Sequence, residues 1–140
     1  MTRTRDELPN GCYRIANDLG NVYYFNSSDQ LHRDGGLPAI ERADGTKEYY
    51  EHGQLHRDGG LPVVECANGS KAYYVNGQPH RDGGLPAFEW ANGTKEYWVN
   101  GQLHRDGGLP AVERADGTKY YYVNGVFIRE EGVFIREEEA

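Results

Sequence analysis

Four identical copies of the triplet His-Arg-Asp are the clearest candidates for chemistry in this chain. Each copy opens the heptapeptide His-Arg-Asp-Gly-Gly-Leu-Pro, and the copies recur every 24 residues. Imidazole and carboxylate groups can share a proton or ligate a metal ion, and an arginine can bind a carboxylate. Catalysis, metal binding and a structural role all have to be weighed. The triplets are His32, Arg33 and Asp34; His56, Arg57 and Asp58; His80, Arg81 and Asp82; and His104, Arg105 and Asp106.

Catalysis by this triplet is known from protein kinases, in which His-Arg-Asp opens the catalytic loop. A kinase also needs a glycine-rich phosphate loop, a strand lysine and an Asp-Phe-Gly sequence. None of these accompanies the triplet in a chain of 140 residues, and a catalytic loop does not occur four times in one enzyme. The sequence therefore excludes a kinase.

Pairs of glutamates are a second candidate for acid–base catalysis. A two-residue turn at Asp44-Gly45 would set Glu41 opposite Glu48, and the equivalent turn would set Glu89 opposite Glu96. The other two units lack the second glutamate, and an open hairpin has no enclosed cleft that would separate the two pKa values. We interpret these residues as a solvated strand face and expect no enzyme.

A metal site shared between units is excluded by distance. Two strands at about 4.8 Å each separate equivalent histidines by about 10 Å, whereas metal ligands lie about 2.0–2.3 Å from the ion. Within one unit, His56 and Asp58 are too few ligands, so we expect no metal and no cofactor. We expect the triplets to bond backbone groups at a bend, with the arginine bridging to a glutamate such as Glu41 or Glu65.

The elements that carry these residues are set by the 24-residue period, which is typical of stacked repeats. The period predicts an all-β protein, an elongated solenoid or meander of β-hairpins with degenerate caps. We interpret residues 1–30 as a degenerate N-terminal capping repeat, residues 31–126 as four hairpin units, and residues 127–140 as a capping strand with an acidic tail.

Each unit holds two hairpin signals of the Asn-Gly or Asp-Gly type, in which positive φ is tolerated. The first set is Asp44-Gly45, Asn68-Gly69, Asn92-Gly93 and Asp116-Gly117. The second set is His52-Gly53, Asn76-Gly77, Asn100-Gly101 and Asn124-Gly125. A two-residue turn at the first signal predicts that Ile40 faces Tyr49 in a core ladder, and that Ala39 faces Tyr50 on the other face. The pattern leaves open which face is better buried.

The chain ends with two copies of Gly-Val-Phe-Ile-Arg-Glu-Glu. By register, Phe127 takes the place of Leu103, so the first copy is expected to be a capping strand whose glutamates discourage pairing at the edge. The second copy is either a frayed tail or an edge strand that pairs two molecules into a homodimer. Its contact residues would be Val133, Phe134 and Ile135.

The net charge of −7 raises the possibility of a nucleic-acid mimic. The charge is concentrated in residues 127–140 and 31–54, which carry −3 and −2, whereas a phosphate mimic needs negative charge along its length. Cys12 and Cys66 are too few for a disulfide framework. The N-terminus lacks a secretory apolar run, and no stretch is long and apolar enough for a membrane span. We expect a cytoplasmic protein that binds neither membrane nor nucleic acid directly.

The run Tyr-Tyr-Val-Asn-Gly at residues 73–77, varied at residues 97–101 and repeated at residues 121–125, resembles MORN-type repeats and bacterial antitoxin-component repeats. The pattern Asn-Gly-x-x-His-Arg-x-x-Gly-x-Pro-Ala is similar to uncharacterised repeats of bacteria, prophages and large DNA viruses. The resemblance covers about residues 31–126, and it implies a non-catalytic interaction module.

Variation within the repeat indicates where such a module would bind. One position next to the first turn differs between units while most others are constant, and arginine and tryptophan are typical of interface hot spots. We expect these residues and neighbouring lysines to align into a partner-binding stripe near the hairpin tips. An alternative is a small phage or mobile-element inhibitor that occupies the nucleic-acid site of a nuclease. The stripe is Arg42, Cys66, Trp90 and Arg114, with Lys47, Lys71, Lys95 and Lys119 beside it.

Overall fold

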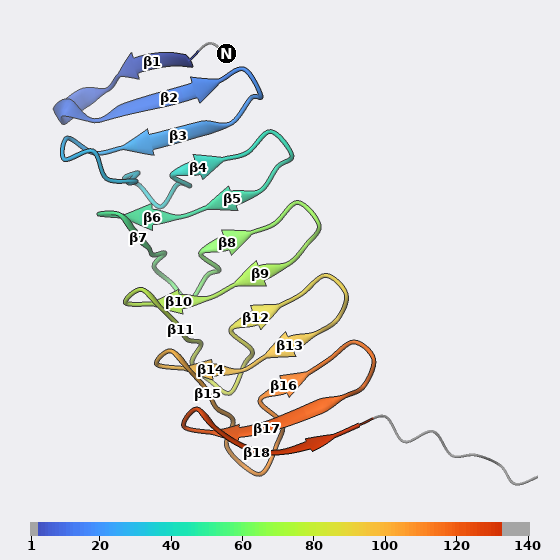
Figure 1. Cartoon of the computed structure of the whole chain (residues 1–140). Coiled ribbons are helices and arrows are strands. Elements are labelled where there is room, and N and C mark those ends of the chain that lie inside the picture. Colours follow the sequence, from blue (N-terminus) through green and yellow to red (C-terminus); the bar gives the residue numbers. More distant parts are fainter. Residues whose placement is uncertain (1–2, 133–140) are drawn as a thin grey trace, which may run out of the picture.

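The computed structural model describes residues 3–132, which form an antiparallel β-meander (Figure 1). Twelve strands make one sheet in the order β1-β2-β3-β4-β5-β8-β9-β12-β13-β16-β17-β18, and three separate pairs are β6-β7, β10-β11 and β14-β15. The only helical element in the described range is the short 3-10 turn η1 (Pro9–Gly11). The all-β class expected from the sequence is confirmed. None of the described residues lies in a helix long and apolar enough to cross a membrane.

The strands are short within the repeats and longer at both ends of the chain. The sheet consists of β1 (Arg3–Glu7), β2 (Tyr13–Asn17), β3 (Val22–Phe25), β4 (Ile40–Glu41), β5 (Lys47–Glu48), β8 (Val64–Glu65), β9 (Lys71–Ala72), β12 (Phe88–Glu89), β13 (Lys95–Glu96), β16 (Val112–Glu113), β17 (Lys119–Val123) and β18 (Val126–Glu131). The separate pairs are β6 (Tyr50–Glu51) with β7 (Gln54–Leu55), β10 (Tyr74–Val75) with β11 (Gln78–Pro79), and β14 (Trp98–Val99) with β15 (Gln102–Leu103).

The first turn of each unit has three residues rather than two. Arg42 pairs with Thr46 through its backbone N–H, and among the turn residues only Gly45 has positive φ, at 96°. The Asp44 carboxylate accepts the backbone N–H of Thr46 at 2.8 Å, which keeps Asp44 in the ordinary φ region. This is a turn that ends in a glycine bulge. The expected two-residue register is therefore wrong by one position.

The corrected register changes the partners in the core. Ile40 lies opposite Glu48 rather than Tyr49, and Ala39 donates its backbone N–H to the carbonyl of the same Glu48 rather than pairing with Tyr50. The expected pairs Ile40 with Tyr49 and Ala39 with Tyr50 are both wrong. The backbone of Tyr49 bonds instead to the next unit, because its N–H donates to the Val63 carbonyl at 2.8 Å.

The buried row alternates small residues with tyrosine rings across the sheet. The small residues are fully buried and the tyrosines nearly so, which settles the face that the sequence left open. The opposite face carries Ile40, which is buried, and Phe88, which is partly exposed. The row comprises Ala39, Tyr49, Val63, Tyr73, Ala87, Tyr97 and Ala111.

The second turn of each unit has two residues, as expected. His52 and Gly53 both have positive φ, at 49° and 79°, and Tyr50 faces Leu55 across the hairpin. Asn76 and Gly77 repeat this conformation. Positive φ at both central residues defines a type I′ turn, whose twist matches that of the strands.

Both ends of the sheet continue the pattern of the repeats. Tyr24 bonds to the Ala39 carbonyl as Tyr49 bonds to that of Val63, so it occupies the equivalent position. At the other end, Phe127 faces Tyr122 as Leu103 faces Trp98, which confirms the expected register of the capping strand β18. The second C-terminal copy, with Val133, Phe134 and Ile135, lies outside the described residues.

Candidate functional site

The histidine and aspartate of each triplet are joined by a hydrogen bond. Nε2 of His32, for example, lies 2.8 Å from Oδ1 of Asp34. The backbone N–H of His52 donates to Nδ1 of His32 at 3.0 Å, so Nδ1 carries no proton and Nε2 donates to the aspartate. The ring thereby ties the loop that follows it to the next hairpin turn. The same Nε2–Oδ1 contact joins His56 to Asp58, His80 to Asp82 and His104 to Asp106.

The arginine of each triplet connects three structural parts. Arg57 donates from NH1 to the Pro62 carbonyl at 3.2 Å and to Glu65 at 2.9 Å, and its guanidinium lies 3.8 Å from the centre of the Tyr49 ring. Tyr49 belongs to the preceding unit, and its hydroxyl also donates to Glu65 at 3.0 Å. The expected arginine–glutamate bridge is therefore present, and it lies on the buried row of tyrosines.

The same guanidinium–tyrosine contact continues through all units and both capping segments. The distances from guanidinium carbon to ring centre are 3.8–4.0 Å. The pairs are Arg5 on Tyr13, Arg33 on Tyr24, Arg57 on Tyr49, Arg81 on Tyr73, Arg105 on Tyr97 and Arg129 on Tyr121.

The proposed partner-binding residues next to the first turns lie on the other face of the sheet. Arg42 forms an ion pair with Glu48 at 2.8 Å, and Arg114 lies 5.1 Å from the centre of the Tyr120 ring. Cys66 has a free thiol and is partly exposed. The tryptophan at the equivalent position, Trp90, donates from its indole N–H to Glu96 at 2.7 Å and stacks on Phe88 with ring centres 5.8 Å apart.

The lysines do not lie beside this stripe, which corrects the expectation. Lys95 pairs with Glu89 and with Glu113, whereas Trp90 pairs with Thr94. Neighbouring residues of a strand point to opposite faces of the sheet. The lysines therefore lie on the face opposite the stripe, where the triplet arginines contact the tyrosine rings. The reason is again the glycine bulge. This correction applies equally to Lys47, Lys71, Lys95 and Lys119.

The expected glutamate pairs also disappear in the corrected register. Glu41 faces Lys47, and Glu48 faces Ile40. Lys47 in turn faces Glu65 of the next unit. Glutamates and lysines therefore alternate across the sheet, and opposite charges stand next to each other.

Two shallow hollows adjoin Arg114 on the stripe face, and Trp90 lines the first of them. Trp90 is 44% exposed although its ring is large and apolar. Arg114 and Thr94 line both hollows, so the two hollows are neighbours. The first hollow, of about 400 Å³, is lined by Asn68, Ser70, Trp90, Ala91, Asn92, Thr94 and Arg114. The second, of about 380 Å³, is lined by Thr94, Glu96, Leu103, Val112, Arg114, Tyr120 and Tyr122.

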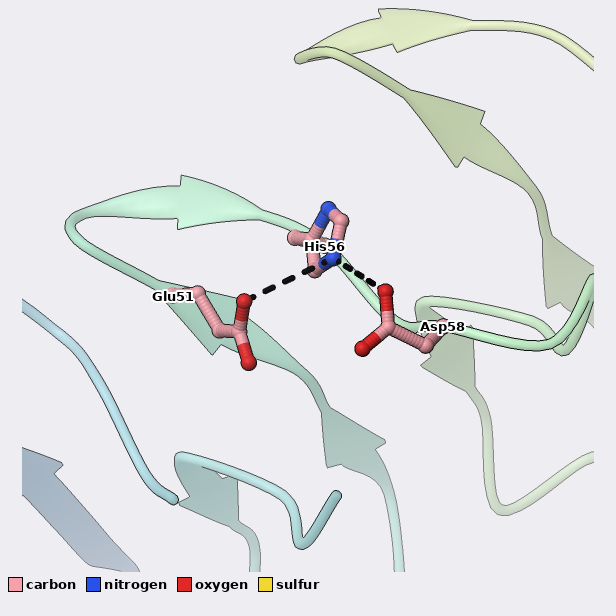
Figure 2. A group of neighbouring side chains, drawn as sticks. All are labelled: Glu51, His56 and Asp58. Atoms are coloured by element: carbon pink, nitrogen blue, oxygen red, sulfur yellow. Dashed lines mark hydrogen bonds and ion pairs between the residues drawn. The ribbon is translucent and has the colours of Figure 1, made fainter. Parts of the chain in front are cut away.

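Among the residues that the structure describes, one unit holds a group with a possible metal-ligand composition. Figure 2 shows Glu51, His56 and Asp58 pointing toward one another, with one ligand atom of each within 4.8 Å of the others. His56 Nε2 lies 2.9 Å from Asp58 and 3.5 Å from Glu51. Sequence reasoning considered His56 and Asp58 and missed Glu51. The available signal was that Glu51 stands where the other units have valine.

Several groups near these features have shifted pKa values. Burial raises the pKa of the Tyr49 hydroxyl, and its hydrogen bond to Glu65 adds to the effect. Burial likewise raises the pKa of Tyr97. In the first turns, the backbone N–H of Thr46 stabilises the Asp44 carboxylate and lowers its pKa. Asp116 is shifted downward in the same way by the backbone N–H of Thr118.

Comparison with known proteins adds no relative to this picture. No family model matches the chain, and no curated protein matches it at a significant level.

Proposed function

We propose that this chain is a non-catalytic protein-interaction module, a solenoid of stacked 24-residue hairpins that binds a partner protein through the stripe of Arg42, Cys66, Trp90 and Arg114. The observation that carries the proposal is the partly exposed indole of Trp90, which lines a hollow together with Arg114. Tryptophan and arginine that line the same hollow have the composition of interface hot spots.

The surroundings of Trp90 support a preorganised binding surface. Its ring is fixed between the stacked Phe88 and the hydrogen-bonded Glu96. A side chain that is already held in one position loses little conformational entropy on binding. Arg114, next to the Tyr120 ring, supplies positive charge at the same place. A partner with an apolar residue flanked by a carboxylate fits this chemistry.

The charge pattern does not favour the alternative, a nuclease inhibitor that mimics nucleic acid. Glu41, Lys47 and Glu65 begin a row in which the sign changes at every strand. Such a row has no continuous negative line of the kind a phosphate backbone presents. The free thiols of Cys12 and Cys66 fit a reducing compartment such as the cytoplasm.

The test is capture of a partner from lysate by the immobilised protein, followed by binding measurements with the purified partner. We expect Trp90→Ala to reduce the affinity at least about 30-fold, which corresponds to about 2 kcal/mol at a hot spot. Arg114→Ala should reduce it less. The matched control is Lys95→Ala, on the opposite face of the same hairpin, which should bind as the unchanged protein does.

The thermal midpoint separates binding from folding. Trp90→Ala should lower the Tm by only a few degrees, because Trp90 is 44% exposed and lies outside the buried row. If Trp90→Ala unfolds the protein, the ring belongs to the core. If Lys95→Ala removes binding and Trp90→Ala does not, the partner binds the face opposite the stripe, and the proposed binding surface is wrong.

A further inference from the structure

One hairpin position breaks the repeat in a way that brings three ligand groups together. Glu51 stands directly before a type I′ turn, at a position where the other units have an apolar residue. His56 donates its backbone N–H to the Tyr49 carbonyl, so it faces Tyr49 across the hairpin. Glu51 lies two residues beyond Tyr49 and therefore shares a face with His56. The apolar residues at the equivalent position are Val75, Val99 and Val123.

The histidine of this unit also differs in conformation from the other three. In the other units, a backbone N–H of the following turn donates to Nδ1 of the histidine at 2.9–3.0 Å. Within the described residues, no such bond joins Asn76 to His56. The His56 side chain is 36% exposed, against 9–15% for its equivalents. The unit with the extra glutamate is thus the unit whose imidazole has turned outward.

The contacts of the imidazole leave one negative group without a full partner. A single Nε2–H can donate well to Asp58 at 2.9 Å, but not also to Glu51 at 3.5 Å. Arg57, the nearest arginine in the sequence, pairs instead with Glu65 and the Tyr49 ring. Two carboxylates therefore converge on one ring nitrogen, an arrangement that a cation in place of the Nε2 proton would stabilise.

We propose that Glu51, His56 and Asp58 form a binding site for a divalent transition-metal ion of the zinc type. Ligand atoms around a tetrahedral ion at about 2.0–2.1 Å lie about 3.3 Å apart, and the two observed separations of 2.9 and 3.5 Å bracket this value. The imidazole nitrogen favours zinc, copper or nickel over magnesium and calcium, which prefer all-oxygen sites. Water would complete the coordination, because the site is open to solvent.

The chain offers its own control for this site. Glu51→Val restores the sequence of the other units, and Val75→Glu places a glutamate beside His80 and Asp82 in the next unit. Neither position belongs to the buried row of the sheet, so both variants should fold, which far-ultraviolet circular dichroism verifies. His80→Asn serves as the matched control for His56→Asn, because it removes an equivalent imidazole from a unit without the glutamate.

The test is calorimetric titration of each protein with zinc sulfate, repeated with cobalt, whose visible absorption reports the coordination. We expect the unchanged protein to bind one equivalent that Glu51→Val and His56→Asn weaken at least about tenfold, while His80→Asn leaves it intact. Val75→Glu should add a second equivalent, and magnesium should bind to none of the proteins. The proposal is overturned if Glu51→Val and the unchanged protein give the same titration, or if Val75→Glu gains no site.

Discussion

The arginine of each triplet should stabilise the packing of neighbouring units, and Arg81 is the best residue at which to measure this contribution. Its guanidinium donates to the Pro86 carbonyl at 3.2 Å and to Glu89 at 2.6 Å, and lies 3.8 Å from the centre of the Tyr73 ring. We predict that Arg81→Ala lowers the free energy of unfolding because all three contacts are lost together.

The size of the effect follows from the exposure of the partners. The Arg81 side chain is 21% exposed and that of Glu89 is 37% exposed, so solvent screens the ion pair to about 0.5 kcal/mol. The bond from a charged donor to the carbonyl contributes about 1–1.5 kcal/mol, and the ring contact contributes about 0.5–1 kcal/mol. The expected loss is about 2–3 kcal/mol, or roughly 6–12 °C in Tm.

The assay is urea unfolding, followed by far-ultraviolet circular dichroism and by fluorescence of Trp90 and Trp98. Coincident transitions are needed before a single free energy is assigned. Arg81→Lys should lose about 1–2 kcal/mol, because lysine keeps the charge but not the planar fork. The control is Arg129→Ala at the capping strand, where the arginine side chain is 59% exposed and the loss should stay below about 1 kcal/mol.

The ring contact can be separated by a double-mutant cycle with Tyr73→Leu. Because Arg81 lies directly over that ring, the two substitutions should be coupled by about 0.5–1 kcal/mol. A loss below about 0.5 kcal/mol for Arg81→Ala, or equal stability of Arg81→Lys and the unchanged protein, would refute this stabilising role of the arginine.

Three further predictions concern acid, alkali and assembly. The lowered pKa values of Asp44 and Asp116 add stability above about pH 4 that is lost as the pH falls further, so the double variant to asparagine should show a flatter urea midpoint between about pH 4 and 2. The raised pKa of Tyr49 means that stability is full below about pH 10 and is lost progressively as the pH rises further; Tyr49→Phe should weaken this alkaline loss, with tyrosine ionisation followed by absorbance at 295 nm. Deleting residues 132–140 should convert a dimer into a monomer by light scattering; an unchanged mass would show that the tail is not the contact.

Much of the fold could be predicted because turn chemistry repeats with the period. His52-Gly53 and Asn76-Gly77 form the expected type I′ turns, and the capping position of Phe127 follows from the register. The first turn could not be read correctly, because the same Asn-Gly or Asp-Gly pair forms either turn type. The difference lies in the side chain of Asp44, which accepts the Thr46 N–H and removes the need for positive φ.

The candidate site was predictable only where it follows the repeat. Arg57 with Glu65 was expected because both belong to the repeating pattern. Its contact with Tyr49 was not, since that tyrosine is in the preceding unit and the register was one residue off. Glu51 was missed for the opposite reason: it is an exception to the period, and only the geometry of the turn brings it to His56.

The arginine–tyrosine contacts imply that a whole 24-residue unit can be removed or added without changing the contacts between the remaining units. The contact in each repeat joins the unit to the segment before it, and the two capping segments carry the same kind of pair, Arg5 on Tyr13 and Arg129 on Tyr121. Excising residues 55–78 would carry Arg81 to the place over Tyr49 that Arg57 now occupies. Removing or adding 24 residues should therefore leave every arginine–tyrosine contact between neighbouring units chemically the same.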